Sequence, residues 1–388
     1  MVKVGGSSLA RWRGQGRLLK LILAPRRLMS KQIVSIVRPV LCEEELTVPR
    51  QASVFCGIDV SADTLSVAVL TSNQAIEQRE FLNTGSEHKA LIAWLGKKKA
   101  LVRVSMEATG IYSMDLALAL DAADGIELAV LNPKRAHDFA KSMMRRSKSD
   151  RADAAVLAEF SLRMKFMAWQ RPGLSALTVR SVTRQIEAFG LEHTRGLNRL
   201  HAAQGSLGTP RCVVEDLKRV LVALERRIVT QRRTARKLID SDEQTREQFR
   251  LLLGMPGIGE ISALQILGEL VLLAPDLTAR QWVARSGLDP VHEDSGSSVH
   301  KPAHISRAGS RHLRRALFMP ALAAVRCDPH LKAFYESLLA RHKSKLQALI
   351  AVARKLLHAI YGVFKSGQPY KGKLLFPNIR LEVESIAG

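Results

Sequence analysis

The spacing of apolar and polar residues changes several times along the chain, and each change marks a predicted element. Two apolar stretches at residues 54–60 and 64–71, followed by a polar stretch at 78–82, are typical of a three-stranded meander. Helical spacing follows at residues 86–97, and the apolar run at 101–106 indicates a buried strand.

Strands and helices then alternate. Residues 111–122 have helical spacing, residues 127–131 indicate another strand, and Pro133 fits the first turn of a helix, where no N–H donor is needed. Three strands followed by alternating helices and strands predict an α/β layer with a mixed sheet. We assign this predicted domain to residues 51–170.

Two long helices are predicted within residues 171–244, separated by the breakers Gly205, Gly208 and Pro210. A narrow apolar stripe at three- and four-residue steps, flanked by arginines, predicts a helical linker that forms an antiparallel pair or an intermolecular coiled coil. An ordinary helical linker domain is the alternative. The stripe consists of Val214, Leu217, Leu221, Leu224 and Ile228.

Residues 245–370 predict a mainly helical carboxy-terminal domain with a glycine turn at 255–259 and a polar loop at 290–309. Residues 371–388 are expected to form a loosely packed tail.

Residues 1–50 are basic and show no sustained period of helix or strand. We expect either a flexible basic extension or a stretch that precedes a start at Met29.

The net charge of the chain indicates which kind of partner the protein binds. Among 388 residues, 59 Lys and Arg against 36 Asp and Glu give a net charge of +23. Such an excess favours nucleic acid over a membrane surface as the partner, because phosphates attract cations regardless of sequence. The four cysteines are far apart without a CxxC pair, and no uninterrupted apolar run approaches the roughly 18 residues of a membrane helix. We therefore expect a cytoplasmic protein with no membrane partner.

Four acidic residues form the candidate site. Asp59 and Glu107 each come at the end of an apolar strand, so neighbouring strands would present their carboxylates side by side. Asp150 and Asp153 are three residues apart, on one face of a predicted helix. Singly, each is more simply a helix-capping or solvated acid. Gathered together they would repel one another unless cations bind, and Mg²⁺ prefers oxygen ligands.

Four motifs carry a resemblance: GIDV at 57–60, MEATG at 106–110 with Tyr112, Asn132-Pro133, and KSDRADA at 148–154. In this order they resemble the DEDD signature of the insertion-sequence one-ten family of transposases. The amino-terminal domain of that family is similar to the RuvC Holliday-junction resolvases and has an RNase H-like fold. The resemblance implies that catalytic Mg²⁺ is held by Asp59, Glu107, Asp150 and Asp153.

The polar loop at 290–309 is a turn on composition alone, and Ser286 before it is typical of an ordinary helix stop. A serine becomes a useful nucleophile only when a base or metal takes its proton and cations stabilise the phosphate, and cations do follow this loop. The segments GLDP at 287–290, DSG at 294–296 and ISRAG at 305–309 resemble the second domain of the same family. That resemblance, which extends over about residues 53–370, assigns the nucleophile to Ser295, although the residues alone do not distinguish it from Ser297 or Ser298.

The turn at 255–259 resembles a helix-hairpin-helix, in which glycines let backbone N–H groups approach a phosphate. A tight turn between packed helices explains it equally well. Thirteen Lys and Arg between 301 and 365, against two acids, favour nucleic-acid backbone contacts over a solvated surface. The predicted contacts are Lys301, Arg307, Arg311, Arg314, Arg315, Gly257 and Gly259.

The leading prediction is a DNA transposase or recombinase that mobilises its own insertion sequence through a covalent phosphoserine. The resemblance also implies a homodimer or homotetramer, a noncoding bridge RNA that pairs with target and donor DNA, and a place near the bacterial nucleoid. Two alternatives stay open: a RuvC-like, structure-specific endonuclease that uses metal and water, and a non-enzymatic nucleic-acid-binding protein in which the acids are structural.

Overall fold

A computed structural model describes residues 54–71, 76–108, 110, 112–143, 149–295 and 299–377, with backbone only at 292–295 and 299–303. The predictions for residues 1–50, for Ser297 and Ser298 and for the end of the tail lie outside the described residues.

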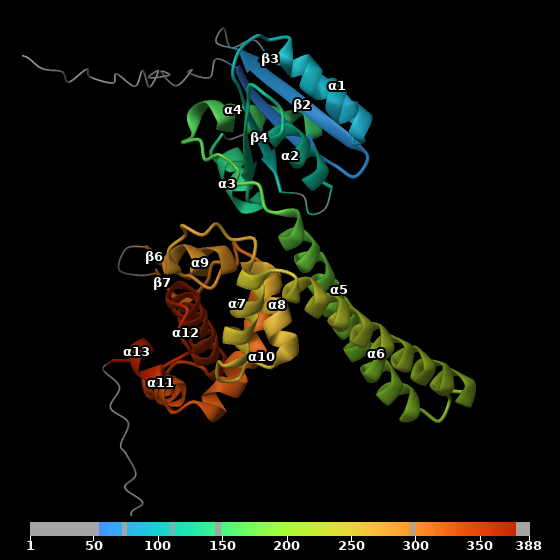
Figure 1. Cartoon of the computed structure of the whole chain (residues 1–388), viewed down its shortest axis with the longest axis vertical. Coiled ribbons are helices and arrows are strands. Elements are labelled where there is room, and N and C mark those ends of the chain that lie inside the picture. Colours follow the sequence, from blue (N-terminus) through green and yellow to red (C-terminus); the bar gives the residue numbers. More distant parts are fainter. Residues whose placement is uncertain are drawn as a thin grey trace, which may run out of the picture. The chain divides into compact units, whose positions relative to one another are not determined.

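A mixed five-stranded sheet forms the first part (Figure 1), with strand order β3-β2-β1-β4-β5. The antiparallel meander β1, β2 and β3 is continued by β4 and β5, which run parallel to β1. This order is consistent with the predicted RNase H-like fold. The strands are β1 (Val54–Val60), β2 (Thr64–Thr71), β3 (Ile76–Leu82), β4 (Val102–Glu107) and β5 (Ile126–Leu131).

Strand alternation sends one set of apolar side chains to each face of the sheet. Helices α1 (Gly85–Gly96) and α2 (Met114–Asp121) cover one face, where they form a core with the side chains of Cys56 and Ile58. Helix α4 (Asp150–Arg163) covers the opposite face and packs on β1, β2 and β4, while α3 (Pro133–Ser142) lies beside it. The predicted helix at 111–122 is shorter than expected, since α2 begins at Met114.

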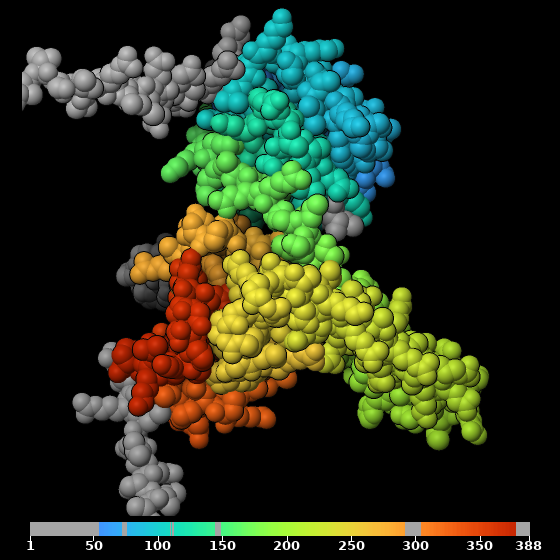
Figure 2. Space-filling view, viewed as in Figure 1, coloured from blue at the N-terminus to red at the C-terminus, as the bar shows by residue number. Residues whose placement is uncertain are grey.

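The long helices α5 (Leu174–Gln204) and α6 (Arg211–Asp240) form the predicted antiparallel pair. Figure 2 shows them in yellow-green, packed side by side along the hairpin. Leu221 and Leu224 of the predicted stripe are buried, whereas Val222 and Val229, which lie outside the stripe on α6, are 45% and 42% exposed.

A second hydrophobic core lies in the helical carboxy-terminal part and includes Val179 and Ile186 of α5. Its helices are α7 (Glu243–Leu253), α8 (Glu260–Leu270), α9 (Ala279–Ser286), α10 (Arg311–Cys327), α11 (Pro329–Ala340), α12 (Lys345–Ser366) and α13 (Gly372–Leu375). By length and composition alone α12 could cross a membrane, but half of that stretch is buried and its buried side chains belong to this core.

Two sequence predictions are wrong in this part. The polar stretch at 290–309 contains an antiparallel hairpin, β6 (Pro290–Ser295) and β7 (Val299–Ile305), rather than only a loop. The register of the two strands shifts between Val291 and Glu293 of β6, and Pro302 of β7 lies opposite this irregularity. Proline is compatible with a strand there because no ladder hydrogen bond is needed. The tail is not loosely packed at its start, because Phe376 is buried with its ring centroid 5.2 Å from that of Phe334.

Candidate functional site

Asp59 and Glu107 lie at the ends of neighbouring parallel strands and project from the same face of the sheet. The β1–β4 ladder runs to the pair Ile58 and Met106, so the next residues along the strands are the two acids. Ile58 and Met106 point into the core beneath α1 and α2. Because side chains alternate along a strand, Asp59 and Glu107 point to the opposite face, which α4 covers.

Helix α4 lies unusually close to β1 because Gly57 has no side chain. A Cβ at Gly57 would stand 2.1 Å from the Ala154 carbonyl oxygen and 2.2 Å from the Ala158 nitrogen. A buried hydroxyl fixes the far end of α4: Ser161 Oγ donates to the Cys56 carbonyl oxygen at 3.2 Å and hydrogen-bonds with Ser105 Oγ at 2.6 Å. The helix is thus attached to both strands that carry the acids.

The first turn of α4 brings Asp150 and Asp153 to this end of the sheet. Ser149 caps the helix by accepting a hydrogen bond from the Ala152 amide at 3.3 Å. Strand β3 holds the same turn from the side, since Gln78 Nε2 donates to the Arg151 carbonyl oxygen at 3.0 Å. Asp150 is exposed and Asp153 is half-buried.

The electrostatics show that the four carboxylates are close enough to interact. Burial and, after it, the charges of Asp150, Asp153 and Glu107 together raise the pKa of Asp59 from 3.8 to about 6. A hydrogen bond from the Val60 amide acts in the opposite direction. The other three predicted acids therefore lie near enough to Asp59 for their charges to act on it.

This donor set suits a hard divalent cation, because all four side chains offer carboxylate oxygens. Within the described residues, no three His, Cys, Asp or Glu side chains are arranged as a formed metal site. The chemistry of the donor set fits a metal such as Mg²⁺. Three nearby negative charges add to the effect of burial on the pKa of Asp59, and a bound cation would neutralise them.

Ser295 ends β6, where its backbone pairs with Val299 of β7. The side chains of Ser295 and Lys301 lie outside the described residues, so their predicted roles stay predictions. Ser286 is buried and its hydroxyl donates to the Val283 carbonyl oxygen at 2.6 Å, which confirms the structural role expected for it.

The base of the β6–β7 hairpin is held by a set of short-range contacts. Ser306 Oγ donates to Asp289 Oδ1 at 2.6 Å, and the Ser306 amide donates to the Asp289 carbonyl oxygen at 2.9 Å. Gly287 ends α9 in the left-handed conformation, with φ of 66°, and its carbonyl accepts from the Arg307 amide. The residues that precede β6 are thereby hydrogen-bonded to the residues that follow β7.

Arg314 has an internal role in the structure. One of its terminal nitrogens donates to the carbonyl oxygens of Ser286 at 2.8 Å and Gly309 at 2.9 Å. Arg314 is a predicted nucleic-acid contact, but in the structure its hydrogen bonds connect the end of α9 to the residues just before α10. Arg307 and Arg311, by contrast, are exposed, and their predicted phosphate contacts stay predictions.

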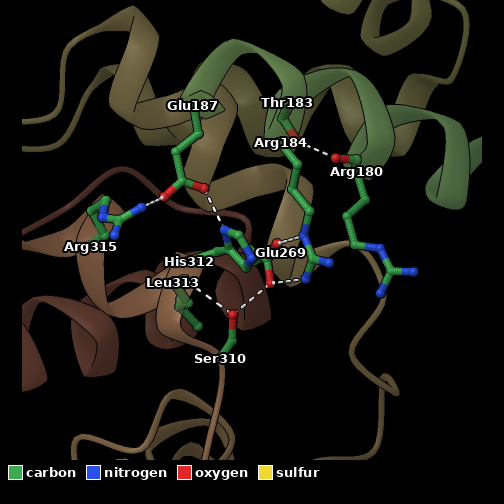
Figure 3. Close-up of polar contacts among 9 residues, drawn as sticks. All are labelled: Arg180, Thr183, Arg184, Glu187, Glu269, Ser310, His312, Leu313 and Arg315. Carbon is green, nitrogen blue, oxygen red and sulfur yellow. Dashed lines mark hydrogen bonds and ion pairs between the residues drawn. The ribbon is translucent and has the colours of Figure 1, made fainter. Parts of the chain in front are cut away.

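Two carboxylates fasten α5 to the same region (Figure 3). Glu187 is buried and accepts from His312 Nδ1 at 2.5 Å and from Arg315 at 2.6 Å. Glu269 of α8 accepts from Arg184 at 2.7 and 3.1 Å. Arg315, another predicted nucleic-acid contact, is thus engaged by an internal partner.

Glu269 also connects to the N-cap of α10, because Ser310 Oγ donates to it at 2.7 Å. Burial alone would raise the pKa of Glu269, but the hydrogen bonds from Arg184 and Ser310 outweigh it and hold that pKa below its ordinary value. Glu269 is therefore an ionised carboxylate that joins α5, α8 and the start of α10.

The glycine turn gives different results for its two glycines. A Cβ at Gly257, which has φ of 76°, would stand 2.5 Å from the Pro320 carbonyl oxygen, so this glycine lets the turn pack on α10. Gly259, the N-cap of α8, faces open space. The packing interpretation explains Gly257, and the phosphate contact of Gly259 stays a prediction.

Comparison with known proteins yields two family models. A transposase model of the DEDD type found in IS110 elements matches residues 56–204, and a model described as transposase, IS116/IS110/IS902 family, matches residues 249–336. Together they cover more than half of the chain. The second match contains the β6–β7 hairpin and the first contains all four acids.

Individual relatives agree with these models. A pilin gene-inverting protein of Moraxella lacunata is 26% identical over 333 residues, which are 82% of this chain and 98% of the relative. The protein of that name from Moraxella bovis is also 26% identical, over 329 residues, 82% of this chain and 98% of the relative. An insertion element IS110 protein of Streptomyces coelicolor is 30% identical over 167 residues, 43% of this chain and 40% of the relative. The chain belongs to the IS110 family of transposases and is an enzyme that recombines DNA.

Proposed function

We propose that this transposase cuts and rejoins DNA in a Mg²⁺-dependent reaction that passes through a phosphoserine at Ser295. The observation that carries the metal part is the effect of three carboxylate charges, on Asp150, Asp153 and Glu107, on the pKa of Asp59. The match to a DEDD transposase model supports the use of a divalent cation.

In this proposal the cation is held by Asp59, Glu107, Asp150 and Asp153, with α4 and the strand ends supplying two acids each. When bound, it would stabilise the charge that develops on the phosphate during strand cleavage. The residues themselves provide the cluster of negative charge, and the close contact at Gly57 and the buried hydroxyl of Ser161 fix the helix that carries two of the acids.

The serine step exchanges one phosphate ester for another. Ser295 Oγ loses its proton to solvent and bonds to phosphorus, while the bond between phosphorus and one deoxyribose oxygen breaks. That oxygen takes up a proton and leaves as a hydroxyl, and the phosphoserine keeps one ester bond in place of the one lost. In the second step a deoxyribose hydroxyl attacks the phosphoserine, which restores Ser295 and a continuous strand.

The first experiment seeks a covalent complex on DNA. A labelled DNA that carries the element's boundary, nicked so that the cut end diffuses away, is incubated with protein and Mg²⁺ and analysed under denaturing conditions. We expect a protein–DNA band that Ser295→Ala abolishes and that Ser297→Ala and Ser298→Ala retain. Cleavage without any covalent band would instead support the RuvC-like nuclease that uses water.

A second measurement tests the acids. Asp59→Asn and Glu107→Gln are expected to lose strand cleavage while they keep DNA binding. If the unmutated protein cleaves no DNA with Mg²⁺ and the variants bind DNA as it does, the acids are structural and the metal proposal is wrong.

The remaining partners belong to the same proposal. The Moraxella relatives are pilin gene-inverting proteins, and we propose that this chain likewise rejoins the DNA strands that it cuts. The family resemblance implies a guide RNA in addition to DNA, and the net charge of +23 permits a second nucleic acid. Sequencing the RNA that copurifies with the protein from a bacterium that holds the whole element tests this, and absence of an element-derived RNA would contradict it.

The oligomeric state and the cellular location are the last two parts of the proposal. The exposed Val222 and Val229 of α6 support a homodimer or homotetramer joined through the long hairpin. A Val222→Glu, Val229→Glu variant is expected to shift the mass in solution to that of a smaller assembly. We propose that the enzyme acts in the cytoplasm at the bacterial nucleoid, where its DNA substrate lies.

A further inference from the structure

Asn83, which follows β3, contacts two loops that are distant in sequence. Its side-chain Nδ2 donates to the Ser61 carbonyl oxygen at 2.8 Å and to the Tyr112 carbonyl oxygen at 3.1 Å. Its backbone amide donates to the Asp63 carbonyl oxygen at 2.8 Å. One asparagine thereby holds the β1–β2 turn on one side and the loop before α2 on the other.

These two loops are the continuations of the strands that carry the acids. Ser61 comes two residues after Asp59, and Tyr112 lies in the segment that leads from Glu107 to α2. The β1–β4 ladder ends at Ile58 and Met106, one residue short of the two carboxylates. Beyond that point Asn83 joins the two chain segments through its side chain.

His88 of α1 fixes the orientation of the Asn83 amide. Its Nε2 lies 2.8 Å from Asn83 Oδ1. Because both carbonyl oxygens must receive hydrogen from Nδ2, Oδ1 is the atom that faces His88, and the imidazole donates Nε2–H. His88 is buried at 5% exposure, so this bond is shielded from water.

We infer that Asn83, oriented by His88, is a positioning residue that sets the distance between Asp59 and Glu107 for metal binding. This inference rests on the proposed metal site. Asn83 does not touch the metal; it holds the main chain on either side of two ligands. Groups that orient metal ligands change metal affinity by about 10-fold to 100-fold when they are removed.

The test measures Mn²⁺ affinity of the full-length protein by electron paramagnetic resonance and by calorimetry, with no DNA present. Asn83→Ala is expected to raise the half-saturating Mn²⁺ concentration by about 10-fold or more. The matched control is Asn198→Ala, an exposed asparagine of α5, which should bind Mn²⁺ as the unmutated protein does. A purely structural role for Asn83 would lower the melting temperature in EDTA and leave Mn²⁺ affinity unchanged, and that result would overturn the inference.

A second pair of variants covers the case in which Asn83→Ala does not fold. His88→Phe keeps a buried ring and both bonds from Asn83 to the carbonyls but removes the donor to Oδ1, so Mn²⁺ affinity should fall by a smaller factor. His88→Gln, which retains an N–H donor, should recover part of that loss. Equal Mn²⁺ affinity in His88→Phe and the unmutated protein would also overturn the inference.

Asp59→Asn separates this inference from the proposed function. It should bind Mn²⁺ far more weakly than the unmutated protein. If it binds Mn²⁺ normally, the metal site itself is wrong and the inference fails with it. If Asp59→Asn loses Mn²⁺ while the Asn83 and His88 variants keep it, the metal site stands and only the positioning role is refuted.

Discussion

Gly57 of β1 lies against the backbone of α4, so close that a methyl group on its Cα would stand 2.1 Å from the Ala154 carbonyl oxygen. Contacts of that length do not occur between well-packed atoms, so only glycine fits here. The consequence reaches the candidate site, because the same helix carries Asp150 and Asp153 in its first turn.

Substitution of this glycine is the first prediction. Gly57→Ala should lower the free energy of unfolding by about 3 kcal/mol, since helix backbone must move to admit the new methyl group. The control is Gly85→Ala, where a Cβ meets nothing within 4 Å and the effect should stay within about 0.5 kcal/mol. Urea unfolding of both variants measures this, and equal midpoints would contradict it.

The pH dependence of stability follows from Asp59. Its pKa is about 6 in the folded protein and 3.8 when unperturbed, so the folded state binds the extra proton between these values. Without metal, the contribution of this group to stability is therefore present at pH 4 and declines as pH rises through 6. For a side chain this exposed to solvent, we expect about 1 kcal/mol after screening is allowed for.

Thermal unfolding in EDTA at pH values from 4 to 7, for the unmutated protein and Asp59→Asn, checks this. The difference between the two should grow with pH in favour of the variant. A divalent cation should reverse the trend for the unmutated protein, because cation binding favours the ionised carboxylates. A pH-independent difference between the two proteins would refute the raised pKa.

Arg311 and Arg314 lie about one turn apart in α10, but their substitution should have different effects on stability and on DNA binding. Arg314→Ala removes the hydrogen bonds to both carbonyl oxygens, and we expect a loss of about 2 kcal/mol in unfolding free energy with little change in the salt dependence of DNA binding. Arg311→Ala should leave stability within about 0.5 kcal/mol and reduce the slope of log affinity against log salt by about 1. A slope reduced by about 1 in a fully stable Arg314→Ala would restore the predicted role of this arginine on DNA.

The buried Glu187 should contribute to the stability of the helical carboxy-terminal part. Glu187→Ala leaves His312 and Arg315 without their acceptor, which should cost about 2 to 3 kcal/mol. Glu192→Ala, an exposed acid on the same helix, serves as the control and should be nearly neutral. Denaturant unfolding of the two variants compares them, and a neutral Glu187→Ala would show that the buried contacts are balanced by their desolvation.

Much of the sheet could be predicted from the chain because each strand has a plain local signal. The strand predicted from the apolar stretch at 64–71, the strand predicted at 101–106 and the helix start at Pro133 are each confirmed within a few residues. The β6–β7 hairpin escaped prediction because its residues are largely polar and rich in serine and glycine, a composition typical of a turn.

The grouping of the acids depended on more than spacing. Asp59 and Glu107 lie close together because the register of β1 and β4 points both side chains to the same face of the sheet, and Asp150 and Asp153 join them because α4 crosses β1 at Gly57. Neither relationship is local in the sequence. Asn83 and His88 gave no sequence signal that they act together, since an asparagine after a strand is typical of any turn. Likewise the internal contacts of Arg314 depend on how α9 meets α10 in three dimensions.

Helix α5 runs without a break from Leu174 to Gln204, and its first half is anchored to α8 and α10 by Arg184 and Glu187. From Glu187 the helix extends about 25 Å to its far end, so a rotation of about 10° at the anchor swings that end by about 4 Å. A force applied at the far end of the hairpin would therefore be transmitted through these contacts to the start of α10, which follows β7 closely in the chain.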